Sequence, residues 1–315
     1  MRTVWTMGFV AAAALSFCFP DFIVFRFGQA VIWSIALLGL VLLCGVSGQF
    51  SFAQAALYGM GGYTAAIAAA HLGNAAGLTG YLGLLLAPVI GYGAGYGLGR
   101  VASGHSIWTQ ALVSYALAIA FPQLLRWRLI EQYTGGVQGL YLDPPAAPFN
   151  LSADRWCFFL ALTLLAVGVL IADNVIRSRS GRALIAARDD ELAAAAQGIK
   201  VVHVRSVASG LAGAYLATAG CLAAFQYGFV GPTAYNFALS VQMLFGVVVG
   251  GMYSPAGAIL GGLFLQFFPD IVGPLGKGLS ALLYALLLIG AIVAMPTGLA
   301  GAFMRLAERA RLARS

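Results

Sequence analysis

Apolar segments long enough to cross a lipid bilayer follow one another along almost the whole chain. A membrane-spanning helix needs about 20 mostly apolar residues, and polar breaks divide this sequence into about ten such segments. Their approximate limits are 5–24, 29–47, 52–72, 81–99, 106–125, 157–176, 206–226, 236–251, 256–272 and 279–297. Only 9% of the 315 residues are charged, against roughly 25% in soluble domains. The sequence therefore predicts an all-α, polytopic membrane protein with a single transmembrane domain over residues 1–315.

Basic residues are distributed unevenly between the loops that join these segments. With ten spans and both termini in the cytoplasm, twelve of the 17 Lys and Arg residues fall on the inner side. These inner residues are Arg2, Arg100, Arg177, Arg179, Arg182, Arg188, Lys200, Arg205, Arg305, Arg309, Arg311 and Arg314. The positive-inside rule predicts this asymmetry. The net charge of +7 therefore follows from topology in a lipid bilayer and does not indicate a nucleic-acid partner.

Two polar segments interrupt the apolar pattern, and the predicted topology places them on opposite faces. The first, about 127–156, is rich in Gly and Pro and predicts a long outer loop with turns. The second, about 177–205, has the pattern of a short amphipathic helix that Gly181 can begin and Gly198 can end. Its apolar side is formed by Leu184, Ile185, Leu192 and Ala195. An ordinary cytoplasmic loop and a docking element for a soluble partner are both consistent with this pattern.

Charged side chains are absent from the middle of every predicted span. Ion- and proton-coupled transporters usually carry an intramembrane ionisable group, so a stand-alone secondary transporter or channel is disfavoured. The polar side chains that remain either join helices by hydrogen bonds or line a transport path, and include Gln49, Gln54, Gln110 and Gln242. The consecutive acids 189–191 favour a solvated or partner-facing turn over a metal site, because adjacent residues of a helix point in different directions.

Glycines in the run 91–99 do not follow the spacing of a nucleotide-binding loop. Gly91, Gly95 and Gly99 recur at every fourth residue inside an apolar segment, which places them on one face of a helix for close packing. The Gly276-Lys277-Gly278 sequence also lacks the first glycine of a phosphate-binding loop, because residue 271 is Ile. We therefore expect no nucleotide site, metal site or catalytic site in this chain.

Several motifs occur together and in order over about 250 residues. They are GQFS at 48–51 with Gly59, Gly61 and Tyr63, TGG at 134–136, SRSGRALIAARDDELAAAAQGI at 178–199, GGMYS at 250–254 with Gly257 and Gly261, and MPTGL at 295–299. In this combination the chain resembles the permease subunit of branched-chain amino acid ABC importers of the LivM type. The resemblance implies a multi-pass subunit of the bacterial inner membrane that moves a small polar solute, with branched-chain amino acids favoured. Urea or short amides are alternative solutes, since their importers share this permease type.

The resemblance also implies partners and site residues. The partners are two cytoplasmic ABC ATPase subunits that bind the ATP, a second homologous permease and a periplasmic solute-binding protein. Coupling to the ATPase would involve Gly181, Arg182, Leu184, Arg188, Glu191, Leu192, Gly198 and Ile199. We expect Leu184, Ile185, Leu192 and Ile199 to form an exposed ridge and Glu191 to pair or cap. Pathway or helix-packing roles would fall to Gln49, Ser51, Gln54, Tyr63, Gln242, Gly250, Gly251 and Gly257.

Overall fold

The computed structural model describes residues 19–71, 78–104, 107–142, 144–145, 147, 151–272 and 298–301. In chain order its elements are α2 (Asp21–Leu40), the π-helix η1 (Val41–Val46), α3 (Gln54–His71), α4 (Leu78–Ala102), α5 (Ile107–Leu125), α6 (Glu131–Thr134), β1 (Leu140–Tyr141), α7 (Ala153–Arg177), α8 (Arg179–Asp189), α9 (Glu191–Ala196), α10 (Val201–Tyr227), β2 (Phe229–Val230), the 3₁₀ turn η3 (Pro232–Ala234), α11 (Phe237–Gly250) and α12 (Pro255–Val272). Two predicted spans could not be compared with the structure. The span 279–297, and residues 5–18 of the span 5–24, lie outside the described residues.

Each of the other eight predicted spans corresponds to one helix of the structure. Five are long and apolar enough to cross a membrane, namely α2 with η1, α4, α5, α7 and α10. The α-helices α11 and α12 are apolar but shorter. The predicted start of the second span at residue 29 is wrong, because α2 begins at Asp21. The charges that suggested a break are paired with distant residues at the surface of the bundle, since Asp21 pairs with Arg155 at 2.7 Å and Arg26 pairs with Asp270.

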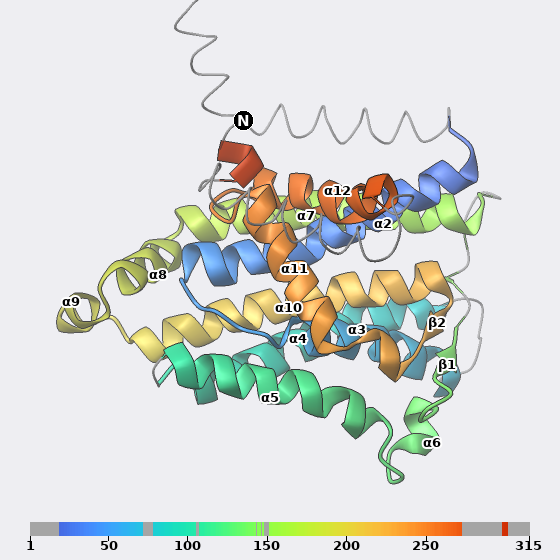
Figure 1. The fold of residues 1–315 in the computed structure, drawn as a ribbon, viewed down its shortest axis with the longest axis horizontal. Coiled ribbons are helices and arrows are strands. Elements are labelled where there is room, and N and C mark those ends of the chain that lie inside the picture. Colours follow the sequence, from blue (N-terminus) through green and yellow to red (C-terminus); the bar gives the residue numbers. More distant parts are fainter. Residues whose placement is uncertain are drawn as a thin grey trace, which may run out of the picture.

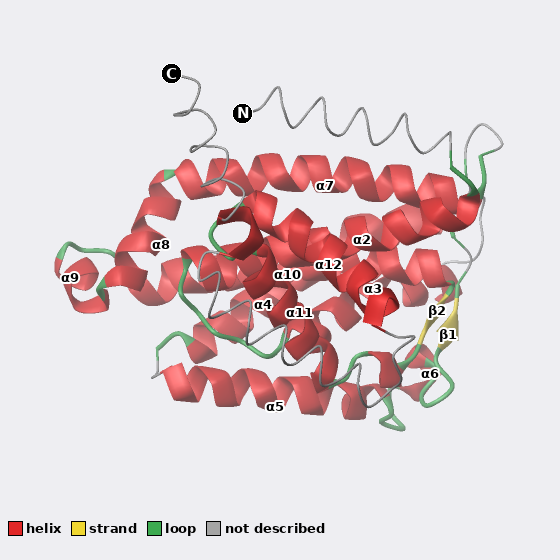
Figure 2. Cartoon of the chain, turned by 45° about the horizontal axis from the view of Figure 1, so that its top comes forward, coloured by secondary structure: helices red, strands yellow, loops and turns green. Residues whose placement is uncertain are grey.

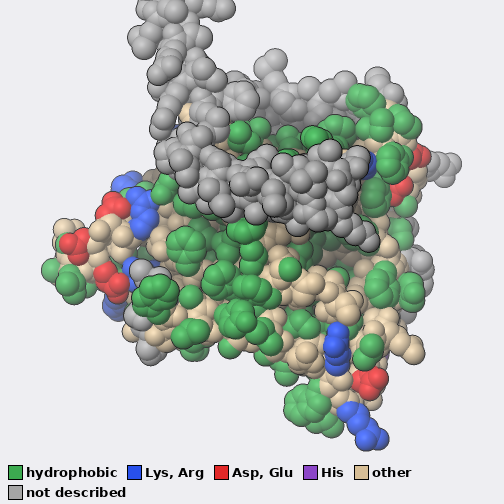
Figure 3. Space-filling model, in the orientation of Figure 1, with side chains coloured by type: hydrophobic (Ala, Val, Ile, Leu, Met, Phe, Trp, Pro, Cys, Tyr) green, Lys and Arg blue, Asp and Glu red, His purple; other side chains and the backbone are tan. Residues whose placement is uncertain are grey.

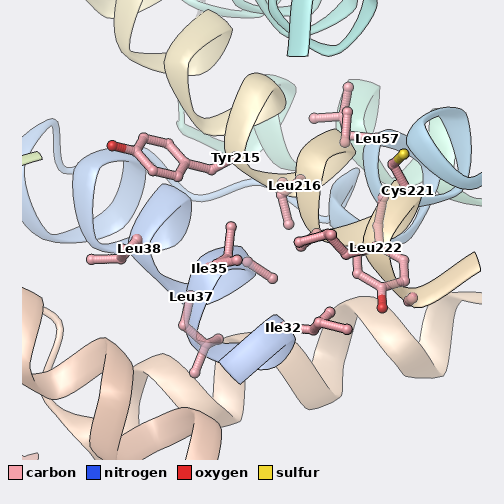
Figure 4. Close-up of a cluster of buried hydrophobic side chains, with 14 of the residues drawn as sticks. Ile32, Ile35, Leu37, Leu38, Leu57, Tyr215, Leu216, Cys221 and Leu222 are labelled. Atoms are coloured by element: carbon pink, nitrogen blue, oxygen red, sulfur yellow. The ribbon is translucent and has the colours of Figure 1, made fainter. Parts of the chain in front are cut away.

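Helix α10 lies at the centre of the bundle and packs against α4, α3, α2 and α7. Its buried Leu216 and Leu222 meet Ile32 and Ile35 of α2, and Leu57 of α3 completes the same cluster (Figure 4). Burying apolar side chains between helices gives the bundle a close-packed interior. Because α2 and α10 are apolar and largely buried, they form the core, while α5 and α7 lie at its sides (Figure 1).

The predicted glycine face of α4 is confirmed as a packing surface. A Cβ atom on Gly91 or Gly95 would collide with the carbonyl oxygens of Gly213 and Ser209 on α10. A Cβ on Gly99 would lie 2.8 Å from the Cα of Ser206. These small residues let the two backbones approach closely, as is common between membrane helices.

The described loops gather at two opposite ends of the bundle. Helices α8 and α9 project from one end, whereas the antiparallel pair β1–β2 closes the other, where Leu140 faces Val230 (Figures 1 and 2). Charged side chains on the visible face concentrate near α8–α9 at one end, and near α6 and the beginnings of α2 and α7 at the other, with hydrophobic surface between them (Figure 3). The described parts of the segments 127–156 and 177–205, which the sequence placed on opposite faces, therefore lie at opposite ends of the bundle.

Candidate functional site

The polar segment 177–205 folds as two short helices rather than the single helix that the sequence predicted. The Ser178 hydroxyl accepts a hydrogen bond from the Gly181 amide at 3.2 Å and caps α8. Asp190 is extended, and its carboxylate accepts from the Ala193 amide at 3.0 Å, which starts α9. Asp is a preferred N-cap residue, so Asp190 followed by Glu191 was a readable signal for the break. Gly181 packs against the last turn of α7 instead of starting the helix.

The expected exposed ridge packs against the chain's own helices at three of its four positions, which corrects the sequence interpretation. Leu184 is only 2% exposed, and Ile185 packs against the main core. Ile199 packs against the small cluster of Ala187, Ala194 and Val201. Only Leu192 remains on the surface, at 83% exposure. The apolar side of this segment therefore docks α8 and α9 onto the bundle, which leaves Leu192 as the large apolar side chain presented outward.

The three consecutive acids each have a different local partner. The Asp189 carboxylate pairs with Arg188 at 2.9 Å, Asp190 caps α9, and Glu191 pairs with Arg205 at 2.8 Å. Glu191 thus pairs within the chain, with Arg205 of α10. Arg205 also donates to the Ala187 carbonyl at 3.1 Å, so it joins α8, α9 and α10. No group of three potential metal ligands occurs among the described residues.

Arg188 connects α8 to the end of η1 and to the turn between α11 and α12. Its guanidinium donates to the Gly45 carbonyl at 2.8 Å and lies 5.7 Å from the centre of the Tyr253 ring. A cation at the carbonyl end of a helix is stabilised by the helix dipole. Gly48 adopts a left-handed backbone (φ 68°), and a side chain there would overlap Arg188. The motif glycine is thus required by both conformation and close contact.

Gln49 joins three helices through one buried amide. Its Nε2 donates to the Arg205 carbonyl at 3.0 Å and to the Ser47 hydroxyl. Its Oε1 accepts from Gln110 of α5 at 2.8 Å and from Ser209 of α10 at 3.2 Å. The side chain is 2% exposed. We call Gln49 with these partners the glutamine node. Its dense hydrogen bonding favours the helix-joining interpretation of this residue.

A small, mostly apolar cavity with a few polar side chains in its lining lies beside the glutamine node. Its volume of about 20 Å³ is lined in part by Ser51, Gln110, Ser114 and Ser209. A space of this size with polar partners suits one water molecule. Ser51, one of the predicted pathway residues, is therefore next to Gln49 in space as well as in sequence.

The remaining predicted pathway residues occupy separate places. Gln54 is buried and donates to the Ser51 carbonyl, whereas its Oε1 has no hydrogen-bond partner among described residues. Tyr63 is buried against Phe121 and Tyr235, and its hydroxyl also has no described partner. Gln242 is half-buried on α11. Among these residues, only Ser51 lines the cavity beside the glutamine node.

Gly250, Gly251 and Gly257 form the close contact between α11 and α12. Cβ atoms on Gly250 or Gly257 would collide with the backbone of the facing glycine. This geometry supports the helix-packing alternative for all three residues, because no side chain fits between the two backbones.

The fold and this polar end define a multi-pass helical membrane protein with a cap of two short helices. Residues 22–293 match the family described as the permease component of branched-chain amino acid transport systems. The chain therefore belongs to this ABC transporter permease family and is a non-catalytic transport component.

Curated relatives agree with the family. The chain is 26% identical over 294 residues to the high-affinity branched-chain amino acid transport system permease protein LivM of Salmonella typhimurium, covering 85% of this chain and 66% of that protein. It is also 26% identical to LivH of Escherichia coli and 25% identical to BraD of Pseudomonas aeruginosa, covering 85% of this chain and 91% of each relative. The chain spans about two thirds of the length of the LivM relative. No solved structure matches it.

Proposed function

We propose that this chain is the transmembrane subunit of an ATP-driven importer for branched-chain amino acids in the bacterial inner membrane. Its partners are two cytoplasmic ATPases, a second homologous permease and a periplasmic solute-binding protein. Family membership over residues 22–293 carries the proposal, and the names of the LivM, LivH and BraD relatives support the solute. The inferred topology has ten spans with both termini inside.

The polar cap formed by α8 and α9 is the proposed ATPase-docking element. It lies at one end of the bundle and presents Leu192 at 83% exposure beside the charged side chains of Asp190 and Glu191. Its other side is fixed to three parts of the bundle through Leu184, Arg188 and Arg205. An exposed anchor on a rigidly attached element suits the transfer of motion from a soluble partner to membrane helices.

Reconstitution tests the proposal directly. The chain is assembled in proteoliposomes with candidate ABC ATPases, a candidate second permease and a candidate solute-binding protein from the same bacterium, and uptake of radiolabelled leucine is measured with and without ATP. We expect uptake only with ATP, and competition by unlabelled isoleucine and valine. Competition by urea or short amides alone would reassign the solute, and ATP-independent uptake would contradict the importer assignment.

A charge placed on the exposed anchor tests the docking element. Leu192→Glu should weaken ATPase association, because an apolar contact is replaced by a desolvated carboxylate. Ala193→Glu is the matched control, since it adds the same charge at a neighbouring exposed position of α9. Equal ATPase co-purification for Leu192→Glu, Ala193→Glu and the unmodified chain would remove Leu192 from the proposed interface.

A further inference from the structure

A pocket of about 470 Å³ lies between α7, α8 and α10, outside the glutamine node and the docking face of α9. One part of its lining is apolar, with Ile171 and Val175 from α7 and Val207 and Leu211 from α10. Both helices are long and apolar enough to cross a membrane. Ile171 and its neighbour Leu170 are each 45% exposed. The apolar part of the pocket is therefore continuous with a surface that faces lipid.

The other part of the pocket is polar and lies toward α8. It is lined by Ser178, which caps α8, by Ser180 in the first turn of α8, and by His203 in the first turn of α10. Along α7 the lining changes from Ile171 to Ser178 over roughly 10 Å, at about 1.5 Å per helical residue. The pocket is thus amphipathic along the direction of the helices, with its polar end at the boundary of the bundle.

Two basic residues, Arg182 and Lys200, flank this polar end without being among the residues that line the pocket. Helices α8 and α10 both begin there, and helix N-termini favour anions. Arg182 reaches back to donate to the Arg177 carbonyl at 3.1 Å, next to Ser178, and Lys200 precedes His203 by about one turn. Neither Arg182 nor Lys200 forms an ion pair with a described acidic group.

The acidic group nearest in sequence to this polar end is already neutralised. Asp173 pairs with Arg177 at 2.9 Å, one turn apart on α7. The carboxylates of Asp189 and Glu191 pair with Arg188 and Arg205 at the far side of the cap. Of the four acids at the cap end, Asp190 alone has no described cationic partner, so the two unpaired cations Arg182 and Lys200 leave that end with a positive balance.

We propose that this pocket binds one anionic phospholipid from the leaflet on the α8 side of the membrane. An acyl chain lies along Ile171, Val207 and Leu211, and the phosphate lies near the serines, Arg182 and Lys200. An apolar occupant alone leaves the cations unused, whereas a free anion leaves the apolar lining exposed. A phospholipid with a negative headgroup satisfies both parts. The proposal is independent of the transported solute and of the ATPase partners.

Native mass spectrometry of the purified full chain tests the site. The chain in detergent is titrated with phosphatidylglycerol or phosphatidylcholine of identical acyl chains. We expect tighter binding of phosphatidylglycerol, which millimolar inorganic phosphate does not displace. Removing both cations in the Arg182→Gln, Lys200→Gln variant should weaken phosphatidylglycerol binding roughly 25-fold, at about fivefold for each basic residue near the lipid surface. Phosphatidylcholine binding should change little.

Two control variants distinguish lipid binding at this site from a general effect of charge and from a protein–protein contact. Arg126→Gln with Arg128→Gln removes the same charge at the opposite end and should leave both lipids bound as before. Val207→Trp fills the apolar part and should weaken both lipids. Equal binding of the two lipids, displacement by phosphate, or an equal effect of the Arg126, Arg128 variant would overturn the proposal. If Val207→Trp blocked association with a second permease but left lipid bound, the pocket would belong to a protein interface instead, which would also overturn the proposal.

Discussion

Replacement of Gln49 by leucine tests the claim that one buried amide joins the helices at the cap end. Leucine has nearly the same size but makes none of the hydrogen bonds of the glutamine. The Gln110 amide, which is 7% exposed, loses its 2.8 Å acceptor. The Arg205 carbonyl loses a donor at 3.0 Å, although Ser209 still reaches it at 3.2 Å.

The expected cost is dominated by the group left without a partner. An unsatisfied buried polar group costs about 1–3 kcal/mol, and the lost bond to the Arg205 carbonyl adds about 0.5–1.5 kcal/mol. The variant should therefore lose roughly 2–4 kcal/mol of unfolding free energy. At about 2 °C per kcal/mol for a chain of this size, the midpoint Tm should fall by roughly 4–8 °C.

Thermal unfolding in detergent measures this loss with a thiol-reactive fluorescent dye. Cys44, Cys157 and Cys221 are free and buried, so the dye labels them as the bundle opens. Gln29→Leu is the matched control, because Gln29 is also 2% exposed but its Nε2 has no described hydrogen-bond partner. That variant should be neutral or stabilising. Midpoints that agree within about 1 °C for the two variants would refute the role assigned to the glutamine node.

Three further outcomes follow from the packing. Gly95→Val should lower Tm strongly, because its side chain would overlap the α10 backbone, whereas Gly93→Val, which faces open space, should not; similar thermal shifts would contradict the close approach. Single cysteines at Val137 and Leu192, 69% and 83% exposed, should react with a membrane-impermeant maleimide from opposite sides of the membrane, and same-side labelling would contradict the topology. Arg188→Gln removes a charge-assisted hydrogen bond worth about 1.5–3 kcal/mol and should leave ATPase association intact while lowering solute-stimulated hydrolysis; unchanged stimulation would show that Arg188 does not transmit motion.

Long apolar segments predicted most of the helices, because both the lipid and the core of the bundle require apolar side chains on the helices that contact them. Eight of the predicted spans could be compared, and each overlaps a helix of the structure. The glycine face formed by residues 91, 95 and 99 could be predicted from the sequence, because residues four positions apart lie on one side of a helix. The start of α2 could not be predicted from the sequence. Asp21 and Arg26 look like a polar break until it is known that Asp21 pairs with Arg155 and Arg26 pairs with Asp270.

The site was only partly predictable for the same reason. The motif at 48–51 marked Gln49, but its bonds to Gln110, Arg205 and Ser209 connect residues 61 to 160 positions apart. Amphipathic periodicity correctly gave an apolar side to the 177–205 segment. It did not tell whether that side faces a partner or the chain's own bundle, because both surfaces are apolar. The structure shows the second arrangement for Leu184.

The attachment of the cap decides how a force on it reaches the membrane helices. A cap held only by its chain ends would dissipate motion in its linkers, but here Leu184 is buried in the main core and Arg188 holds the Gly45 carbonyl. Gly45 belongs to η1, where the helical turn is wider than in an α-helix, and it also packs tightly against Met252 in the α11–α12 turn. π-helical turns are frequent at functional sites. A displacement of α8 must therefore move the end of α2 and the α11–α12 turn together, or break the Arg188 contacts. The proposed importer requires the first outcome, which makes Arg188, rather than the exposed charges of α9, the residue through which docking would act on the bundle.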